Sequence, residues 1–545
     1  MVLEETCLVT APHHGHADGY RPPAVTGLHD LIDAQAGRRP RARALLVGAD
    51  RAPVSYGTLA ALAGELALQL RAEGLRPGRP VGLVSGNNLE FVVALLGAAR
   101  AGLVVAPLDP TLPEPERQAC YTALGVQAVL TGPPAAIQRP ASPEVPAATL
   151  GGPAYWPLTV ARGNDGQYAV TLAAGAAPLP GGAAHGAATE LTGEDALALF
   201  TAGTTGRAKT VPLTHTNVAA SVRSIAACYR LTPEDATVAA MPFFHGHGLL
   251  AGLLTTLASG GCVLLPERGR FTAHTFWDDM RAASATWYTA VPTIHDILLQ
   301  RAPQEYCGSR VLPLRFARSC SAPLAPATAR ALEHLLDAPV LSAYGMTEST
   351  HQAASEPLSA PPGRTPGSVG RPAPVRVRVL DAAQRPCAPG TEGEIWVQGP
   401  TVARGYLTDP EATAAAFHDG WFRTGDLGRL DPEGRLLLTG RLKNLINRGG
   451  EKISPELVEE VLTAFPGVTE AAVFAVPDPL YGQCVGAAVV LGRGSTSTDY
   501  DLLAHCRSRL APYEVPDRLA IVLSLPHTAK GTLNRRAVAD LYGSR

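Results

Sequence analysis

The sequence predicts an α/β fold: a large N-terminal domain of helix-covered, mostly parallel sheets plus a small β unit, then a small α+β C-terminal domain on a hinge. Helical and buried strand patterns alternate as far as about residue 341, which is typical of a parallel sheet covered by helices. Short alternating strands follow from Gly367, and helices mix with strands beyond Gly440. We expect a loose N-terminal tail over 1–26, a large domain over 27–440 and a small mobile domain over 441–545.

Composition and charge restrict the class of protein. The 545 residues include 46 Lys+Arg and 48 Asp+Glu, a formal net charge of −2, and 46% are hydrophobic, which is typical of globular proteins. A near-neutral balance without a basic tract argues against nucleic acid or an anionic membrane as the main partner. Nine cysteines without a CxxC pair or metal-ligand spacing indicate reduced thiols. We expect a cytoplasmic monomer or homodimer with no nucleic-acid or membrane partner.

The first helices and strands show clear periodicity. Apolar residues recur every three or four positions over 59–70, which predicts an amphipathic helix. The run Pro80-Val-Gly-Leu-Val-Ser predicts a buried strand, and a helix is expected from Asn88 to Ala101. Residues 132–190 are rich in Ala, Pro and Gly, so we expect a surface excursion with a few short strands there and no separate domain.

The stretch from Gly248 to Pro266 carries no charge and has to be distinguished from a membrane span. Glycines and hydroxyl side chains interrupt it, and only a weak basic signal follows it. We therefore expect a buried helix, a Gly-Gly turn and a short strand over Cys262–Leu265.

The C-terminal part has boundary signals of its own. Short strands are expected over 375–380 and 393–399. Ser454-Pro455-Glu456 favours a helix start, because Ser caps, Pro tolerates the first helical position and Glu favours the positive end. Two strands and two helices complete the unit, expected over 470–476, over 485–491, from near Thr498 and from near Asn534.

The strongest chemical signal is the segment Phe200-Thr-Ala-Gly-Thr-Thr-Gly-Arg-Ala-Lys-Thr-Val-Pro. It follows a predicted strand over 196–200, and it combines glycines, hydroxyls and Lys209, which supply backbone N–H groups, O–H donors and a cation for phosphate. A P-loop would run straight into a helix, whereas Pro212 delays the helix to about Thr214. The P-loop interpretation therefore fails on its context.

This segment resembles the phosphate-binding loop of the adenylate-forming superfamily, which includes acyl-CoA synthetases, adenylation domains of peptide synthetases and luciferases. Four further motifs resemble that family and follow in its order: Ser342-Ala-Tyr-Gly-Met-Thr-Glu-Ser, Trp421-Phe-Arg-Thr-Gly-Asp, Gly440-Arg-Leu-Lys-Asn-Leu-Ile-Asn-Arg-Gly-Gly-Glu-Lys-Ile-Ser-Pro and Pro526-His-Thr-Ala-Lys-Gly-Thr-Leu-Asn-Arg-Arg. A chance match of five ordered motifs is negligible, and the resemblance extends over residues 27–540. Three segments are expected to form the acyl pocket: Pro242-Phe-Phe-His-Gly-His-Gly-Leu-Leu, Tyr288-Thr-Ala-Val-Pro-Thr-Ile-His and Arg318-Ser-Cys-Ser-Ala-Pro-Leu-Ala-Pro. Together with Met346-Thr-Glu-Ser-Thr-His351, they look closest to the oxalate–CoA ligase branch.

The resemblance implies roles for individual residues, with ATP, Mg²⁺ and coenzyme A as the expected cofactors. Cofactor contacts are implied for Thr201, Thr204, Thr205, Gly206, Lys209, Tyr344, Gly345, Thr347, Asp426, Arg441, Gly449 and Gly450. The implied catalytic set is Lys209, Thr347, Glu348, Arg441 and Lys530. Glu348 would hold Mg²⁺, because a hard dication prefers oxygen ligands. Lys443 matches the hinge, where backbone rotation would move the small domain between two catalytic poses.

The sequence departs from the family pattern in its last motif. The family's catalytic lysine follows the glycine, whereas here Thr532 takes that place and Lys530 precedes the glycine. Positions two apart in an extended segment point to one face, so Lys530 would reach the α-phosphate from a displaced position. In the alternative, the role is lost and adenylation is slow or assisted by Lys209. The sequence leaves both open.

The acid pocket that the resemblance implies is polar. The residues that stand where a carboxylate and its tail would lie are His245, His247, Ser319, Ser321 and His351. Any one of these histidines taken alone is more often a hydrogen-bonded core residue. Together they favour a small polar or anionic acid, because buried donors without acceptors are costly.

The resemblance thus implies an AMP-forming ligase that activates a small polar carboxylic acid as acyl-AMP and forms a thioester with coenzyme A. One alternative is adenylation of a small oxyanion, carboxylate or nitrite, with transfer to an amine, as in aryl-amine diazotisation, or to a carrier-protein thiol. Another is a non-catalytic relative that binds nucleotide. Glu348, Asp426 and Arg441 argue against that last alternative, and the altered lysine motif argues weakly for it.

Overall fold

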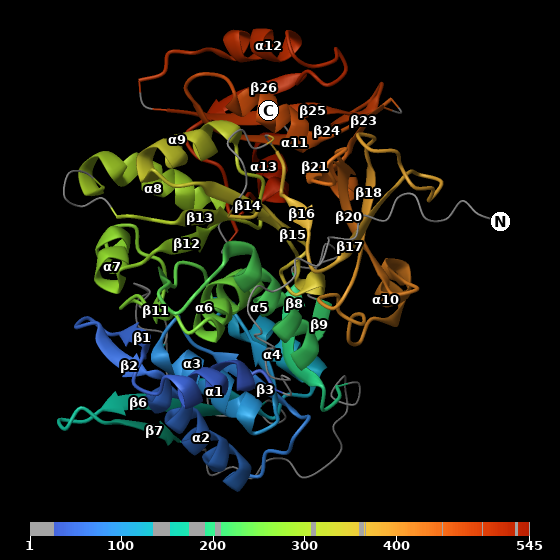
Figure 1. Ribbon diagram of the computed structural model, residues 1–545. Helices are drawn as coiled ribbons and strands as arrows, with labels where there is room; N and C mark the ends of the chain where they lie inside the picture. Colours follow the sequence, from blue (N-terminus) through green and yellow to red (C-terminus); the bar gives the residue numbers. More distant parts are fainter. Residues whose placement is uncertain are drawn as a thin grey trace.

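A computed structural model describes residues 27–133, 153–173, 191–201, 209–306, 312–358, 365, 367–449, 451–492, 494–528 and 532–543. Figure 1 shows a large lobe, coloured from blue to orange, and a smaller red lobe above it. The predicted α/β class, with a large N-terminal domain and a small C-terminal one, is confirmed. The tail expected over 1–26 lies outside the described residues.

A seven-stranded sheet forms the lower part of the large lobe. Its strand order is β7 (Tyr168–Leu172), β6 (Ala154–Arg162), β5 (Ala128–Thr131), β3 (Pro80–Val84), β4 (Val104–Pro107), β8 (Asp195–Thr201) and β9 (Lys209–Thr214). Neighbours from β6 to β8 are parallel, and both edge strands are antiparallel. Helices α2 (Tyr56–Ala72) and α3 (Leu89–Arg100) cover one face and α4 (Glu114–Leu124) the other. The helices and strand predicted in this region are confirmed.

Side-chain caps explain why two helices begin where the sequence predicts. The Asn88 side chain accepts a hydrogen bond from the Phe91 N–H at 3.0 Å and starts α3. Thr214 and Asn217 form a reciprocal capping box that starts α5 (His215–Tyr229). Local sequence therefore fixes the first turn of both helices.

A second, five-stranded sheet occupies the middle of the molecule (Figure 1). Its order is β12 (Trp287–Ala290), β13 (Phe316–Ser319), β14 (Val340–Tyr344), β15 (Ala354–Ser355) and β16 (Arg371–Pro372). Helices α7 (Phe276–Ala283), α8 (Pro292–Glu305) and α9 (Pro326–Leu336) pack on one face, and α5 lies on the other. Beside it, a four-stranded sheet has the order β10 (Ala236–Val238), β11 (Cys262–Leu264), β1 (Arg43–Val47) and β2 (Ala52–Ser55).

The uncharged stretch after Gly246 is buried in the large lobe. It begins as a π-helix, η2 (His247–Leu254), continues as α6 (Thr255–Ala258) and leads into β11. A Cβ on Gly248 would lie 2.2 Å from the Pro242 carbonyl oxygen, so glycine permits this close approach. The predicted helix, turn and strand are confirmed, although the sequence analysis did not foresee the π-helix. Of the helices that the structure describes, none has both the length and the apolar character to cross a bilayer.

The small β unit precedes the C-terminal lobe. Its strands are β17 (Arg376–Leu380), β18 (Gly393–Gln398), β19 (Phe417–His418), β20 (Trp421–Leu430) and β21 (Leu436–Arg441), with α10 (Pro410–Ala416) beside them. Every pairing among these strands is antiparallel. A single 3₁₀ turn, η5 (Leu442–Asn444), then leads into the small lobe.

The C-terminal lobe is one sheet with helices on both faces. Its strands are β22 (Ile446–Arg448), β23 (Glu451–Ile453), β24 (Val468–Asp478), β25 (Gly482–Leu491) and β26 (Arg518–Val522). Helices α11 (Pro455–Thr463) and α12 (Asp499–Arg507) pack on one face and α13 (Arg535–Tyr542) on the other. Ser454, Thr498 and Asn534 cap these helices as predicted.

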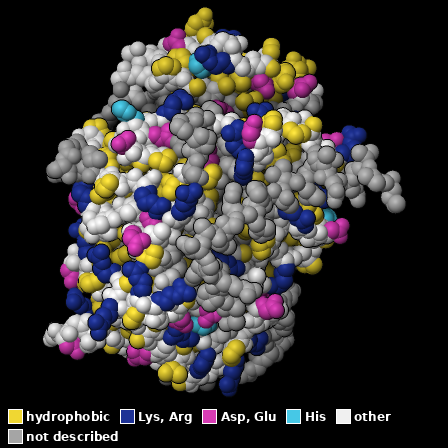
Figure 2. Space-filling model, viewed as in Figure 1, with side chains coloured by type: hydrophobic (Ala, Val, Ile, Leu, Met, Phe, Trp, Pro, Cys, Tyr) yellow, Lys and Arg dark blue, Asp and Glu magenta, His cyan; other side chains and the backbone are white. Residues whose placement is uncertain are grey.

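The charges on the surface are mixed. On the face shown in Figure 2, Lys and Arg side chains are spread over the large lobe with Asp and Glu side chains among them. This distribution agrees with the near-neutral balance of the sequence.

Candidate active site

The loop predicted to bind phosphate joins two antiparallel strands. β8 ends at Thr201 and β9 begins at Lys209, and these two residues are paired across the hairpin. A strand follows the loop where a P-loop would have a helix, and α5 begins only after Thr214, as Pro212 predicts. Thr204, Thr205 and Gly206 lie outside the described residues.

Lys209, Tyr406 and Glu348 form a first polar cluster. The Lys209 Nζ lies 4.5 Å from the centroid of the Tyr406 ring, and the Tyr406 hydroxyl donates to Glu348 Oε1 at 2.8 Å. Burial raises the pKa of Glu348, whereas the Tyr406 hydrogen bond and the Lys209 charge act in the opposite direction. The Glu348 carbonyl accepts from the Ala403 N–H at 2.8 Å, which ties the loop of Tyr406 to the loop of Glu348.

Tyr344, Asp426 and Arg441 form a second cluster. The Tyr344 hydroxyl donates to Asp426 Oδ2 at 2.7 Å, and Arg441 Nε lies 2.7 Å from Asp426 Oδ1. Asp426 and Arg441 are paired between β20 and β21, so the sheet register places them together. Burial raises the pKa of Asp426, and the Arg441 charge followed by the Tyr344 hydrogen bond opposes this shift. A carboxylate offers about four acceptor positions, so these partners leave room for further donors.

The loop after β14 connects this part of the site to the acid pocket. A Cβ on Gly345 would lie 2.5 Å from the His351 carbonyl carbon, so glycine lets the two ends of the loop meet. Thr347 begins the 3₁₀ turn η4 (Thr347–Ser349), and His351 has a φ of 60°. The turn directs Glu348 towards Tyr406 and His351 towards His247.

His247, His351 and Ser321 meet at the predicted acid pocket. The two imidazole rings stack with centroids 4.9 Å apart, and His247 Nδ1 lies 3.1 Å from Ser321 Oγ. Burial lowers the pKa of His247 well below its ordinary value and that of His351 to about 3, so both rings are neutral. His351 Nε2 makes no hydrogen bond to the part of the chain that the structure describes.

The other two predicted pocket residues lie differently. His245 is half-buried, with its ring 4.6 Å from the Phe244 ring. Ser319 follows Arg318 on β13, so alternation along the strand directs its side chain to the opposite face of the sheet. The structure therefore does not bring Ser319 to the histidine pair.

Lys443, which the sequence predicts as the hinge, lies within electrostatic reach of both carboxylate clusters. Burial and then the neighbouring Arg441 lower the pKa of Lys443, while Asp426 and Glu348 act in the opposite direction. Gly449 has a φ of 59°, and its N–H donates to the Tyr481 carbonyl at 2.9 Å. Thr532 Oγ1 lies 2.8 Å from Thr528 Oγ1, so this hydroxyl is engaged within its own turn. Lys530 and Gly450 lie outside the described residues.

Comparison with known proteins decides the family. The AMP-binding enzyme family matches residues 32–407, and the C-terminal domain of AMP-binding enzymes matches residues 457–532. This chain belongs to the AMP-binding enzyme family. An oxalate–CoA ligase of Arabidopsis thaliana is 41% identical over 525 residues, which cover 94% of this chain and 98% of the relative. A sulfoacetate–CoA ligase of Cupriavidus necator is 35% identical, covering 94% and 97%.

Solved structures agree with this assignment. ATP-bound MatB from Rhodopseudomonas palustris superposes with a TM-score of 0.78 at 30% identity, covering 94% of this chain and 99% of that one. The resemblance found in the motifs is therefore confirmed, including its closeness to oxalate–CoA ligases. The AMP-binding enzyme described here is an AMP-forming ligase.

Sequence reasoning missed several residues of this AMP-binding enzyme that the structure places in or beside the clusters. They are Tyr406 beside Glu348, and Thr289 and Arg318 beside His247; the last two lie in segments expected to form the acid pocket but were not themselves predicted as contacts. Elsewhere, the exposed Arg404 pairs with the buried Asp195. Tyr406 and Arg404 follow Pro400 in a loop with no periodic pattern, so no signal in the local sequence marks them. Arg318 carried a signal: a charged residue inside the apolar strand Phe316–Ser319.

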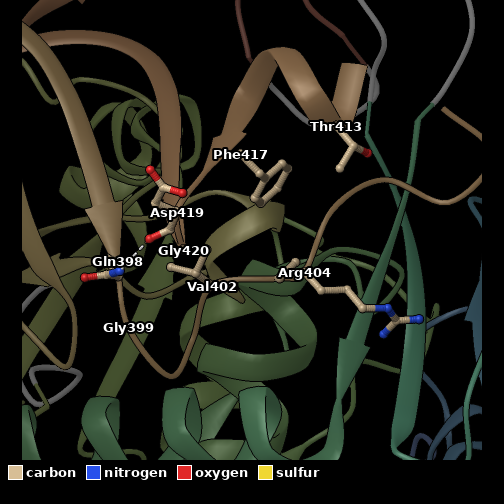
Figure 3. Close-up of a pocket in the computed structure, with 9 residues that line it drawn as sticks. Gln398, Gly399, Val402, Arg404, Thr413, Phe417, Asp419 and Gly420 are labelled. Carbon is tan, nitrogen blue, oxygen red and sulfur yellow. Dashed lines mark hydrogen bonds between the residues drawn. The ribbon is translucent and has the colours of Figure 1, made fainter. Parts of the chain in front are cut away.

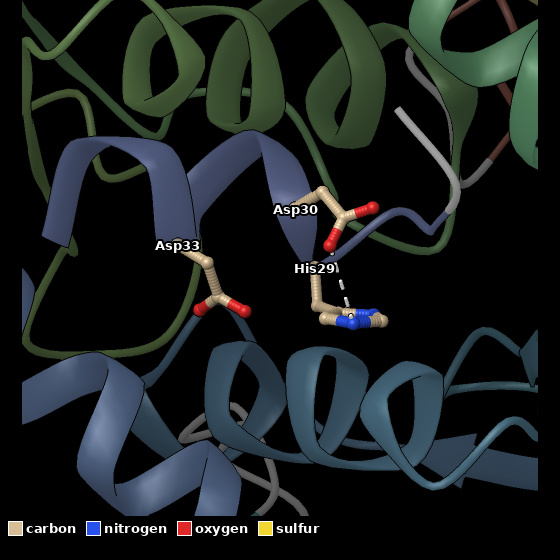
Figure 4. A group of neighbouring side chains, drawn as sticks. All are labelled: His29, Asp30 and Asp33. Atoms are coloured by element: carbon tan, nitrogen blue, oxygen red, sulfur yellow. Dashed lines mark ion pairs between the residues drawn. The ribbon is translucent and has the colours of Figure 1, made fainter. Parts of the chain in front are cut away.

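Two other features of the surface lie outside these clusters. A cavity of about 620 Å³ opens between the end of β18, α10 and the loop before Tyr406, and Arg404 and Asp419 line it (Figure 3). The Arg404 guanidinium is already paired with Asp195, at 2.8 Å for Nη2 and Oδ2. His29, Asp30 and Asp33 gather at the start of α1 (Asp30–Arg38) (Figure 4), but Arg100 pairs with Asp33, so we assign no metal there.

Proposed function

We propose that the protein activates a small polar carboxylic acid with ATP as an acyl-adenylate, releases pyrophosphate and transfers the acyl group to coenzyme A. The observation that carries this proposal is the buried, stacked histidine pair, His247 and His351, with Ser321 beside it and the buried Arg318 guanidinium behind it. A pocket with these donors disfavours an apolar tail, because the donors would lose their partners. The relatives named for oxalate and sulfoacetate, both small acids with a second acidic group, support the same choice.

The nucleotide would bind across the two carboxylate clusters. Asp426 retains acceptor capacity for the ribose hydroxyls, and Tyr344 is held at its side by their hydrogen bond. Lys209 and Arg441 would bring positive charge to the phosphates. The half-buried Glu348 carboxylate fits Mg²⁺, because a hard cation prefers carboxylate oxygen and would stabilise the ionised form. The ion would neutralise phosphate charge.

Two chemical steps would follow. In the first, a carboxylate oxygen of the acid attacks the α-phosphorus of ATP, and the bond to pyrophosphate breaks. In the second, the coenzyme A thiolate attacks the acyl carbon and AMP leaves. We propose that rotation at Lys443 moves the small domain, taken as residues 441–545, between the two steps. Thr201 and Thr347 would add hydroxyl donors to the phosphates, and Lys530 would approach the α-phosphate from its displaced position.

The test is a pyrophosphate-release assay over oxalate, malonate, sulfoacetate, acetate, octanoate and nitrite, with coenzyme A or an aryl amine as acceptor and mass spectrometry of the products. We expect release with a small polar acid and a thioester when coenzyme A is present. His351→Phe keeps an aromatic ring but removes Nε2, so the rate with the best acid should fall. His418→Phe, at a histidine stacked on Trp396 in the β unit, is the matched control. Release with nitrite and no thioester would overturn the proposal.

A further inference from the structure

Arg318 is an unusual residue for the position it occupies. It lies on β13 with 0% of its surface exposed, and no carboxylate among the described residues forms an ion pair with it. Its Nη1 donates to Thr289 Oγ1 at 3.3 Å, while its Nε and Nη2 make no hydrogen bond within the described chain. The Tyr229 hydroxyl is a polar neighbour of this guanidinium, but burial raises the pKa of that phenol, so it supplies no negative charge. Burying a guanidinium without an anionic partner costs several kcal/mol.

Thr289 lies directly across from Arg318, on the neighbouring strand β12. Its hydroxyl is 2.6 Å from His247 Nε2. A guanidinium is a donor only, so the Thr289 oxygen accepts from Arg318 and keeps one proton to donate. Within the described residues, the hydrogen-bonding acceptor in reach of that proton is His247 Nε2.

This arrangement selects one form of the His247 ring. If Nε2 carried the ring proton, the buried Thr289 O–H would have no acceptor, which costs about 1–3 kcal/mol. With Nε2 accepting, the neutral ring carries its proton on Nδ1 and donates to Ser321 Oγ at 3.1 Å. Ser321 is exposed and has a φ of 74°, so its own proton is available to a ligand.

We propose that Arg318 and Thr289 form a hydrogen-bond relay that holds His247 in its Nδ1–H form, so that the acid pocket presents donors to a second anionic group of the substrate. The relay runs from Arg318 to Thr289, His247 and Ser321, and every proton points from the buried cation towards the pocket. Hydrogen bonds in such a chain polarise one another in the same direction. This inference rests on the proposed function, and it makes Arg318 and Thr289 positioning residues for a dianionic acid.

The first arm of the test measures which nitrogen of the His247 ring is protonated, and it needs no substrate. In protein labelled with ¹⁵N-histidine, the His247 signals, assigned with His247→Gln, should show a protonated Nδ1 and an unprotonated Nε2. Thr289→Val has nearly the same shape but no hydroxyl, and it should shift the ring towards the other form or a mixture. Thr289→Ser keeps the hydroxyl and should restore the wild-type pattern. A protonated Nε2 in the wild-type protein would overturn the relay.

The second arm uses the best acid of the substrate panel. Loss of one hydrogen bond that acts on a charged ligand should raise the KM for that acid about tenfold in Thr289→Val, with kcat changed far less. Thr289→Ser should return the KM to the wild-type value. Thr237→Val, at a buried threonine on β10 whose hydroxyl has no partner in the described chain, is the control for packing. An unchanged KM in Thr289→Val overturns the relay. If no acid is activated by the wild-type protein, the proposed function is overturned. In that case, the NMR measurement of the His247 ring still decides whether the relay exists.

Discussion

Tyr406 offers the sharpest test of the carboxylate cluster, because one atom can be removed without disturbing its ring. Its hydroxyl donates to Glu348 Oε1 at 2.8 Å, and its ring lies under Lys209, 4.5 Å from Nζ. Tyr406→Phe removes the hydrogen bond and keeps the cation–π contact. Any effect on activity then results from the lost hydrogen bond to Glu348 and not from a displaced Lys209.

The size of the effect follows from the burial of the carboxylate. A hydrogen bond to a charged group contributes about 1.5–3 kcal/mol, and each 1.36 kcal/mol is tenfold in rate. If Glu348 must be ionised and oriented in the first step, kcat/KM for ATP should fall by about 10- to 150-fold. The hydrogen bond lowers the pKa of Glu348 against the effect of burial, so its removal raises that pKa. As the pH is lowered, Tyr406→Phe should therefore lose activity at a higher pH than the wild-type protein does.

The assay is pyrophosphate release measured as a function of pH for Tyr406→Phe and for a matched control. Tyr155→Phe provides the control, because the Tyr155 hydroxyl donates to Glu114 Oε1 at 2.5 Å in another part of the large lobe. Both variants should lose some free energy of unfolding, and the control should keep the wild-type pH profile. The reasoning is refuted if the two variants have the same profile and the same kcat/KM.

Two further predictions concern the catalytic assignments. Glu348→Ala should abolish pyrophosphate release in an assay with saturating ATP and Mg²⁺, because no carboxylate would remain to hold the cation at the phosphates; near-normal release would contradict the assignment. Lys530→Ala should slow pyrophosphate release more than Thr532→Ala, because the Thr532 hydroxyl lies 2.8 Å from that of Thr528, within its own turn. Equal and negligible effects in single-turnover measurements would mean that this motif no longer serves adenylation.

Local chemistry explains which parts of the fold were predictable. Helices that start on a capping side chain begin where the sequence predicts, as at Asn88 and Ser454, because the cap and the first turn are neighbours in the chain. The π-helix after Gly246 was not predictable in this way. Apolar periodicity predicts a helix there, but it does not distinguish the hydrogen-bond spacing of a π-helix from that of an α-helix.

The site residues, too, fall into those that local motifs predict and those that depend on contacts in the folded protein. The motifs gave Tyr344, Asp426 and Arg441 before the structure joined them by two hydrogen-bonding contacts of 2.7 Å. Tyr406 could not be found, because a tyrosine in a loop is an ordinary residue there. Thr289 lies in a segment expected to form the acid pocket, but its contact with His247 could not be predicted from the sequence. Their positions acquire meaning only from partners 58 and 42 residues away in the chain.

Charge is balanced differently at the two ends of the candidate site. At the end proposed for the nucleotide, Asp426 is buried and Glu348 half-buried, and each has a phenol and a cationic neighbour. At the acid end, Arg318 has no carboxylate partner among the residues that the structure describes, and the histidines near it are neutral. A folded chain retains an unpaired buried cation where a ligand supplies the opposite charge, since the cost of burial is otherwise not offset. On the proposed function, the nucleotide end is therefore assembled in advance, whereas the acid end would be completed by an anionic substrate.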